Sequence, residues 1–238
     1  MQGKRIKHKN LIGISIVVLL LLVLFFLARQ SVLFPIRTIT VNGDYWHVSQ
    51  TKIKNIVNRD IQGSFFSTSL PKIRANLLKE LPWAKTVSAS KQWPGIINIT
   101  IEQKKAIAIW NGVALLQANG QLFYPLSTSF PKNIPVFIGE SNTKIKSIDL
   151  YQKMTPVLLK DNVTGELKIT RIKITPQGNC LVTFNNKTVV MLGDVNILAL
   201  FSRFVAIYKQ VFEKKQKIPE YVDMRYSHGL AVKWEKSS

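Results

Sequence analysis

Residues that commonly build catalytic or metal sites are scarce in this chain. Its 238 residues include 13 acidic residues, three histidines and a single cysteine, Cys180. One cysteine cannot form an intrachain disulfide, and the strand-like context of Cys180 indicates a small buried thiol rather than a nucleophile. His47 and His228 have no partners at metal-motif spacing, and the sequence shows neither a phosphate loop nor a paired-carboxylate signature. We therefore expect a non-enzymatic protein without catalytic residues, a bound cofactor or a metal.

The shortage of acidic residues leaves a large excess of positive charge. Lysine and arginine together number 33, so the formal net charge is +20. These residues are spread along the chain, and only four of them lie among the first ten residues. This spread is typical of a protein that works beside anionic lipid or a cell-envelope polymer. Nucleic acid is the weaker interpretation, because no basic stretch alternates with aromatic residues at a recognised motif spacing.

Charge is absent from one long apolar segment, Leu11–Ala28. As a helix that rises about 1.5 Å per residue, this segment would span roughly 27 Å, close to the hydrocarbon thickness of a bilayer. Four basic residues precede it and only Arg29 follows closely, which predicts a cytoplasmic tail over residues 1–10 and an exported remainder. The alternative is a cleaved signal peptide, but its apolar region would be shorter, and Phe25–Arg29 offers no small-residue cleavage site. We therefore predict a single-pass transmembrane helix over residues 11–28.

Beyond this helix, the pattern predicts a small α+β domain over residues 34–104 with the order β-α-α-β-β. Alternation of apolar and polar residues indicates the strands, and a 3.6-residue period indicates the helices. The predicted strands are 36–41, 84–91 and 96–103, and the predicted helices run from caps at Ser49 and Ser69 to Gly63 and Pro82. The side chains expected to face the core are Ile53, Ile56, Val57, Ile61, Ile73, Leu77, Leu78, Leu81, Ile97, Ile99 and Ile101.

The remainder, residues 105–238, is predicted to be a mostly antiparallel β domain with flanking helices. Two Asn-Gly turns, at residues 111–112 and 119–120, predict consecutive hairpins. One helix is expected at 145–160, and Asp194 is expected to cap another that has a broad apolar face. The residues spaced along one side of the first of these helices are Ile148, Tyr151, Gln152, Thr155 and Leu159. The predicted strands are 106–110, 113–117, 122–124, 167–174, 180–184, 189–192, 221–226 and 230–234.

The last predicted strand, 230–234, is expected to lie at a sheet edge. An edge strand presents unpaired N–H and C=O groups and can accept a strand from a partner. Tyr226 and Trp234 lie beside this edge, and aromatic side chains often anchor interfaces. Two interpretations of Trp234 stay open, because it could anchor a partner or only close the core of the domain. The apolar face of the helix after Asp194 is interpreted as core packing, with a partner groove as the alternative.

Several short motifs, in a fixed order, resemble the FtsQ/DivIB family of bacterial cell-division proteins. The segment Phe34–Gly43 resembles the opening of a POTRA domain of that family. The other matching segments are Gln62–Phe66, Leu81–Trp83, Trp93–Pro94 and Ile99–Glu102, followed by Asn119–Phe123, Ile134–Val136, Val222–Tyr226 and Gly229–Trp234. Each motif is weak by itself. Their order behind a short N-terminal anchor is specific, and it covers nearly the whole chain.

The resemblance implies a structural component of the divisome. It places the chain in the inner membrane of a Gram-negative cell at the division septum, with a cytoplasmic N-terminus and periplasmic C-terminal domains. It implies that FtsB, and through it FtsL, binds the last strands and the adjoining helix by strand addition. At matching positions, Arg225 would pair with an acidic partner residue, and Tyr226 and Trp234 would supply buried contact area. FtsK, FtsA, FtsW, FtsI and FtsN are further partners that the resemblance suggests.

Two places depart from the family pattern. Lys233 stands where some relatives have a small residue, and Gln177 and Gly178 stand where some have arginines, which puts a second ion pair with the partner in doubt. Two other function classes stay open from the residues alone. One is a different membrane-tethered POTRA-type adaptor in envelope transport or biogenesis. The other is a membrane-anchored cell-wall enzyme, for which the sequence supplies no acid–base or metal set.

Overall fold

The computed structural model describes residues 3–28, 30, 32–43, 46–160, 167–213, 218–227 and 229–234. The chain divides into two compact units, Met1–Lys104 and Lys105–Ser238. Arg29 and His228, which enter the sequence interpretation above, lie outside the described residues.

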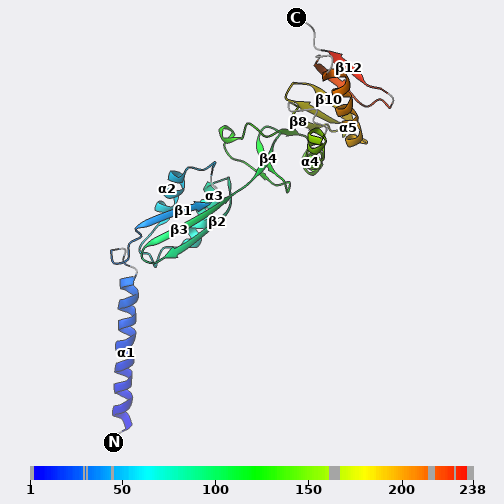
Figure 1. Cartoon of the computed structure of the whole chain (residues 1–238). Coiled ribbons are helices and arrows are strands. Elements are labelled where there is room, and N and C mark those ends of the chain that lie inside the picture. Colours follow the sequence, from blue (N-terminus) through cyan, green and yellow to red (C-terminus); the bar gives the residue numbers. More distant parts are fainter. Residues whose placement is uncertain are drawn as a thin grey trace. The chain divides into compact units, whose positions relative to one another are not determined.

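The first unit begins with helix α1 (Gly3–Ala28), which contains the predicted helical segment 11–28 (Figure 1). All side chains from Gly13 to Leu27 are exposed. Across the part of the chain that the structure describes, no helix is both long enough and apolar enough to cross a membrane. A membrane-spanning role for α1 stays a prediction.

The rest of the first unit has the predicted β-α-α-β-β order. It comprises β1 (Thr38–Gly43), α2 (Gln50–Asp60), α3 (Leu70–Glu80), β2 (Ala84–Gln92) and β3 (Ile96–Gln103). The sheet order is β1-β3-β2, so the last strand lies in the middle. β1 runs parallel to β3, and β2 runs antiparallel to it.

The core of this unit lies between the sheet and its two helices. In β3, alternate side chains at Ile97, Ile99 and Ile101 are fully buried, as their two-residue period predicts. α2 contacts β1, α3 contacts β2, and the two helices contact each other. Leu77 of α3 is fully buried, but Leu78 is 44% exposed, so the prediction for Leu78 is wrong. Consecutive residues on a helix differ by about 100° in direction, and Leu78 therefore points away from the face that Leu77 shares with the core.

The helix ends differ in how well the sequence predicted them. Ser69 caps α3 as expected, because its hydroxyl accepts a hydrogen bond from the backbone N–H of Lys72. Ser49 precedes α2 but makes no side-chain cap bond, and α2 ends at Asp60 rather than at Gly63. The Asn76 side chain on α3 donates a 2.7 Å hydrogen bond to the Asp60 carboxylate, which ties the end of α2 to its neighbour.

The second unit is built on a nine-stranded sheet of order β12-β11-β10-β9-β8-β7-β4-β5-β6. Antiparallel pairs outnumber the parallel pairs, which are β10–β11, β4–β7 and β7–β8, so the sheet is mixed. The two predicted hairpins, β4–β5 and β5–β6, are present. The strands are β4 (Ala106–Trp110), β5 (Ala114–Gln117), β6 (Leu122–Phe123), β7 (Val136–Ile138), β8 (Ile169–Ile174), β9 (Cys180–Phe184), β10 (Val189–Gly193), β11 (Pro219–Asp223) and β12 (Ala231–Trp234).

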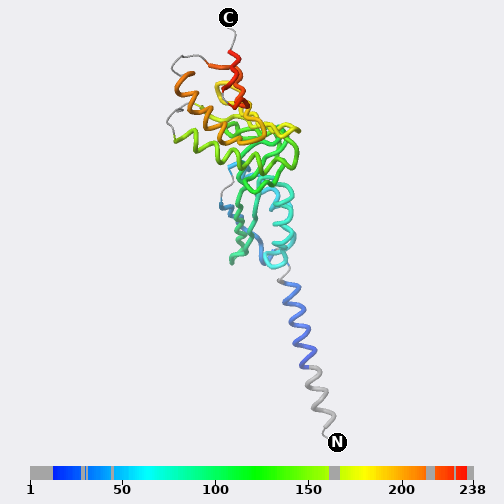
Figure 2. The backbone as a smooth tube through the Cα atoms, turned by 90° about the vertical axis from the view of Figure 1, so that its right-hand side faces the viewer, coloured from blue at the N-terminus to red at the C-terminus, as the bar shows by residue number. Residues whose placement is uncertain are grey.

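Two helices, α4 (Lys144–Lys160) and α5 (Ile197–Ile207), pack against this sheet and against each other (Figure 2). α5 continues as a π-helical turn, Tyr208–Glu213, and short 3₁₀ turns lie at Ser127–Ser129 and Ser141–Thr143. Phe184 of β9 is fully buried, and its ring stacks on Phe201 and Phe204 of α5 at centroid distances of 6.3 and 5.5 Å. The helix that the apolar pattern predicted is therefore held to the sheet largely by aromatic packing.

Cys180 lies in this core with no exposed surface. Burial raises the pKa of its thiol to about 12, so the thiol stays protonated at neutral pH. The interpretation of Cys180 as a small buried thiol is confirmed.

The helices of the second unit differ from prediction in their inward face and in one cap. The residues that α4 buries are Ser147, Ile148, Leu150, Met154 and Leu158. Leu159 is 70% exposed and Gln152 is also exposed, so of the residues along the predicted side only Ile148 is buried. The Ser147 hydroxyl donates to the carbonyl of Thr143, which lets a polar side chain occupy a buried position. α5 begins after Asn196, which has a left-handed backbone, rather than at a cap formed by Asp194.

Candidate interaction surface at the last strand

The last strand, β12, lies at one end of the nine-stranded sheet, as the sequence predicts. It pairs antiparallel with β11, where Val232 lies opposite Val222 and Ala231 lies opposite Asp223. Within the described residues, no strand pairs with its outer edge. That edge presents backbone donors and acceptors to which an extended segment of another chain can bind.

The turn that leads into β12 is held by one side chain of α5, Arg203. Its Nη1 donates to the carbonyl oxygen of Ser227 at 3.0 Å. Its Nη2 lies at 2.8, 2.8 and 3.2 Å from the carbonyl oxygens of Met224, Tyr226 and Gly229. Among the described residues, its buried Nε finds no acceptor. The two terminal nitrogens thus fix the turn, which a rigid guanidinium can do with little loss of side-chain entropy.

Tyr226 is presented on this turn with 56% of its surface exposed. A hollow of about 420 Å³ beside it is lined by Tyr226, Ser227, Gly229, Leu230 and Ala231. An exposed aromatic side chain next to a hollow and an open strand edge is suited to anchor a partner.

Trp234 combines the two roles that the sequence left open. Its ring makes an edge-to-face contact with Phe212 at a centroid distance of 5.6 Å, and Phe212 is only 3% exposed. Trp234 itself remains 40% exposed. It therefore closes part of the core and still offers surface to a partner, whose binding there stays a prediction.

Arg225, the third predicted site residue, is already paired within the chain. Its Nε and Nη2 donate to the Asp223 carboxylate at 3.0 and 2.7 Å, and its backbone N–H donates to the same carboxylate at 3.1 Å. These hydrogen bonds hold the pKa of Asp223 below its usual range and raise the pKa of Arg225. The Arg225 side chain is still about half exposed, so any contact with a partner would involve an ion pair rather than a free cation.

Acid is expected to weaken the second unit through Asp223. Its folded pKa is depressed, so its contribution to stability is present above an unfolded pKa of about 4 and is lost as pH falls below that value. Asp223→Asn should lower the free energy of unfolding at pH 7 by about 1–2 kcal/mol and flatten its dependence on pH between about 5 and 3. Urea unfolding across this pH range measures both effects.

Asp149→Asn is the matched control for that measurement. Asp149 pairs with Lys153 on α4, but both side chains are more than half exposed, so the pair should contribute little. Equal pH profiles for the two variants would show that the Asp223–Arg225 pair contributes no more to the free energy of unfolding than an exposed surface pair.

The positions that depart from the family pattern take ordinary structural roles. Lys233 forms a 2.7 Å ion pair with Glu220 of β11, across the β11–β12 pair. Gln177 is exposed in the turn between β8 and β9, where Gly178 has a positive φ of 85°. In the sheet order, β10 and β11 stand between β9 and β12, so the turn that carries Gln177 does not belong to a strand next to the β12 edge.

Arg203 is a functional candidate that the sequence interpretation missed. A signal was available, because Arg203 is the only charged residue in α5. A lone arginine in an otherwise apolar helix usually has specific hydrogen-bond acceptors, which pattern counting does not identify.

The histidine considered as a possible metal ligand, His47, has ordinary packing contacts. His47 stacks on the indole of Trp83 at 3.8 Å, and its Nδ1 lies 3.3 Å from the Gln103 side chain. In the described ranges, no group of three or more histidine, cysteine, aspartate or glutamate side chains is placed to hold a metal ion.

Comparisons with known proteins match both units. A family model for the FtsQ-type POTRA domain matches residues 34–103, and one for the C-terminal part of the cell division protein FtsQ/DivIB matches residues 108–225. The cell division protein FtsQ of Coxiella burnetii is 31% identical over 244 residues, which cover 98% of each chain. The FtsQ proteins of Hahella chejuensis and Escherichia coli are each 27% identical, over 84% of this chain and 70% and 73% of their own. This chain therefore belongs to the FtsQ/DivIB family of cell-division proteins.

Proposed function

We propose that this chain is a non-enzymatic scaffold of the divisome that recruits FtsB, and through it FtsL, by strand addition at β12. The observation that carries the proposal is the outer edge of β12, with which no described strand pairs and beside which Tyr226 is exposed. A partner strand on this edge would extend the sheet and satisfy its free backbone groups. The hydrogen bonds from Arg203 to the carbonyls of the turn, here called the Arg203 clamp, support the proposal. They order the turn before β12, and an edge that is already ordered loses little entropy on binding.

The same proposal assigns a membrane anchor and a topology. Residues 11–28 of α1 would cross the inner membrane, with residues 1–10 in the cytoplasm. The POTRA domain (34–104) and the β domain (105–238) would lie in the periplasm at the division septum. Two features support this topology: the apolar side chains exposed along Gly13–Leu27, which suit lipid better than water, and the four basic residues before the segment.

Membership of the FtsQ/DivIB family implies protein–protein interactions within the divisome. We assign FtsK to the POTRA domain, and FtsA, FtsW, FtsI and FtsN as further members of the same assembly. The two units offer separate surfaces for such partners, since each has its own core.

The double variant Tyr226→Ala, Trp234→Ala tests the proposed site. The full-length chain in detergent should lose FtsB–FtsL affinity by about a hundredfold, because each aromatic anchor of an interface contributes roughly 1–2 kcal/mol or more. Affinity is measured by titration of a labelled FtsB–FtsL complex. Thermal unfolding must accompany it, because Trp234 also contacts the buried Phe212.

A matched control removes the same residue types elsewhere. Trp46 is 89% exposed and Tyr124 is 65% exposed, so Trp46→Ala, Tyr124→Ala should bind the complex like the unaltered chain. Tyr226→Ala alone separates binding from folding, since the exposed ring of Tyr226 can be removed without opening the core. Undiminished binding by the folded double variant would exclude β12 as the site.

A further inference from the structure

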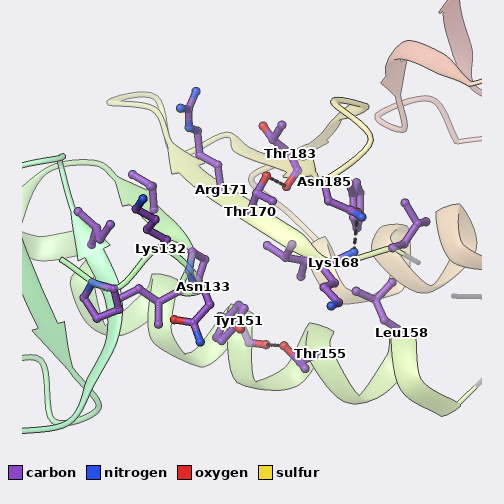
Figure 3. Close-up of a pocket in the computed structure, with 18 of the residues that line it drawn as sticks. Lys132, Asn133, Tyr151, Thr155, Leu158, Lys168, Thr170, Arg171, Thr183 and Asn185 are labelled. Atoms are coloured by element: carbon purple, nitrogen blue, oxygen red, sulfur yellow. Dashed lines mark hydrogen bonds between the residues drawn. The ribbon is translucent and has the colours of Figure 1, made fainter. Parts of the chain in front are cut away.

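A cavity of about 780 Å³ lies in the second unit, on a part of the sheet separate from the β12 edge (Figure 3). Its walls come from α4, the start of β8, the end of β9 and the segment before β7. In the sheet order, β10 and β11 stand between these strands and β12. Its volume lies within the range of pockets that hold small ligands or short peptide segments, roughly 300–1,000 Å³.

Among the residues that the structure describes, those that line the cavity include four cations and no acidic side chain. Lys132, Lys168, Arg171 and Lys187 all line it, and all four are exposed. None of the four has an ion-pair partner in the described part of the chain. A concave surface with charges of one sign concentrates the electrostatic potential and attracts an anionic ligand.

Apolar side chains line the same cavity as the cations. Figure 3 shows Lys132 to the left of Lys168, with Tyr151 and Thr155 of α4 lower in the view. Leu158 also lines it, and Leu159 adds a side chain that is 70% exposed. A ligand that fits both features carries negative charge and apolar groups together.

Internal hydrogen bonds preform the walls of the cavity. The Asn185 side chain accepts from the backbone N–H of Lys168 at 2.8 Å, and the Asn185 N–H donates to the Lys168 carbonyl at 3.0 Å. The Thr170 hydroxyl donates to the carbonyl of Thr183 at 3.1 Å (Figure 3). A site whose backbone is already ordered binds without a large entropic cost.

The lining residues distinguish among anionic ligands. Glycans and nucleic acids bind on exposed aromatic faces, but Phe184 is 1% exposed and the ring of Tyr151 packs against Phe137 at 5.6 Å. A bilayer surface is flat and does not enter a concave site. We propose that this cavity binds an acidic peptide segment with interspersed apolar side chains, supplied by a partner protein.

The test uses a fluorescein-labelled peptide of alternating glutamate and leucine with the full-length chain in detergent. The variant K132Q/K168Q/R171Q/K187Q should weaken binding by about tenfold or more in fluorescence anisotropy, because four favourable charge pairs are lost. Leu159→Gln should weaken binding by about threefold, because it removes one exposed apolar contact. Raising the salt concentration should weaken binding to the unaltered chain more than to the quadruple variant.

The matched control is K52Q/K72Q/K79Q/K85Q, which removes four exposed lysines from the first unit. It should bind the peptide like the unaltered chain, and so should the double variant at Tyr226 and Trp234, which separates this site from β12. Equal losses in both quadruple variants would show only diffuse charge attraction and overturn the proposal. Equally tight binding of oligoglutamate without leucine, or of an anionic oligosaccharide, would also overturn it.

Discussion

Replacing Arg203 with methionine is expected to loosen the turn before β12 and to weaken FtsB–FtsL binding by at least about tenfold. The side chain donates to the carbonyls of Ser227, Met224, Tyr226 and Gly229. Hydrogen bonds from a charged donor each contribute about 1.5–3 kcal/mol, although partly exposed carbonyls can bind water instead. We therefore expect a loss of about 2–4 kcal/mol in the stability of the second unit.

Hydrogen exchange of the amides of residues 225–227, together with titration of the FtsB–FtsL complex, measures this effect. Exchange should accelerate locally in Arg203→Met before the whole unit opens, because the turn loses its ties to α5. Arg203→Lys should recover only part of the protection, since an ammonium group cannot replace the planar fork of the guanidinium. Lys173→Met, which removes one exposed charge from β8, is the control for net charge. Unchanged exchange and affinity in Arg203→Met would show that β11 and β12 order the turn without the clamp.

The clamp also explains how helix and strand can act as one surface. Arg203 lies next to Phe204, which is fully buried and stacks on Phe184 of β9. Core packing therefore fixes the position of the guanidinium, and the guanidinium fixes the turn that carries Tyr226. A partner at β12 would then bind an edge whose geometry is set by the core of the domain.

Local patterns predicted most of the helices and strands of this chain. The two-residue alternation of Ile97, Ile99 and Ile101 identified β3, and Ser69 identified the start of α3. Both signals act over a few residues, so neighbouring sequence alone carries them. The position of β12 at a sheet edge agrees with the sequence prediction.

Features that depend on distant packing were not predictable. The parallel pairs of β7 with β4 and β8 join segments far apart in sequence, which no local pattern specifies. The inward face of α4 includes Ser147, because a backbone carbonyl satisfies its hydroxyl. The Arg203 clamp joins residues 21 to 26 positions apart. Such contacts depend on how β11 and α5 meet in space.

Phe204→Ala is expected to have the largest effect on stability and to show that the two units unfold separately. The side chain has no exposed surface and packs between Phe184 and Tyr208 at centroid distances of 5.5 and 5.8 Å. Truncation of a buried phenylalanine costs about 3–5 kcal/mol, through lost burial and the cavity left behind.

Urea unfolding followed by hydrogen exchange should show a lower midpoint for residues 105–238 and an unchanged one for residues 34–104. Ser202→Ala, at the exposed neighbouring position, should change neither midpoint. An equal fall of the midpoint in both units would mean that they unfold as one cooperative body. A loss of binding caused by a change in the second unit could then not be separated from a loss of stability in the POTRA domain.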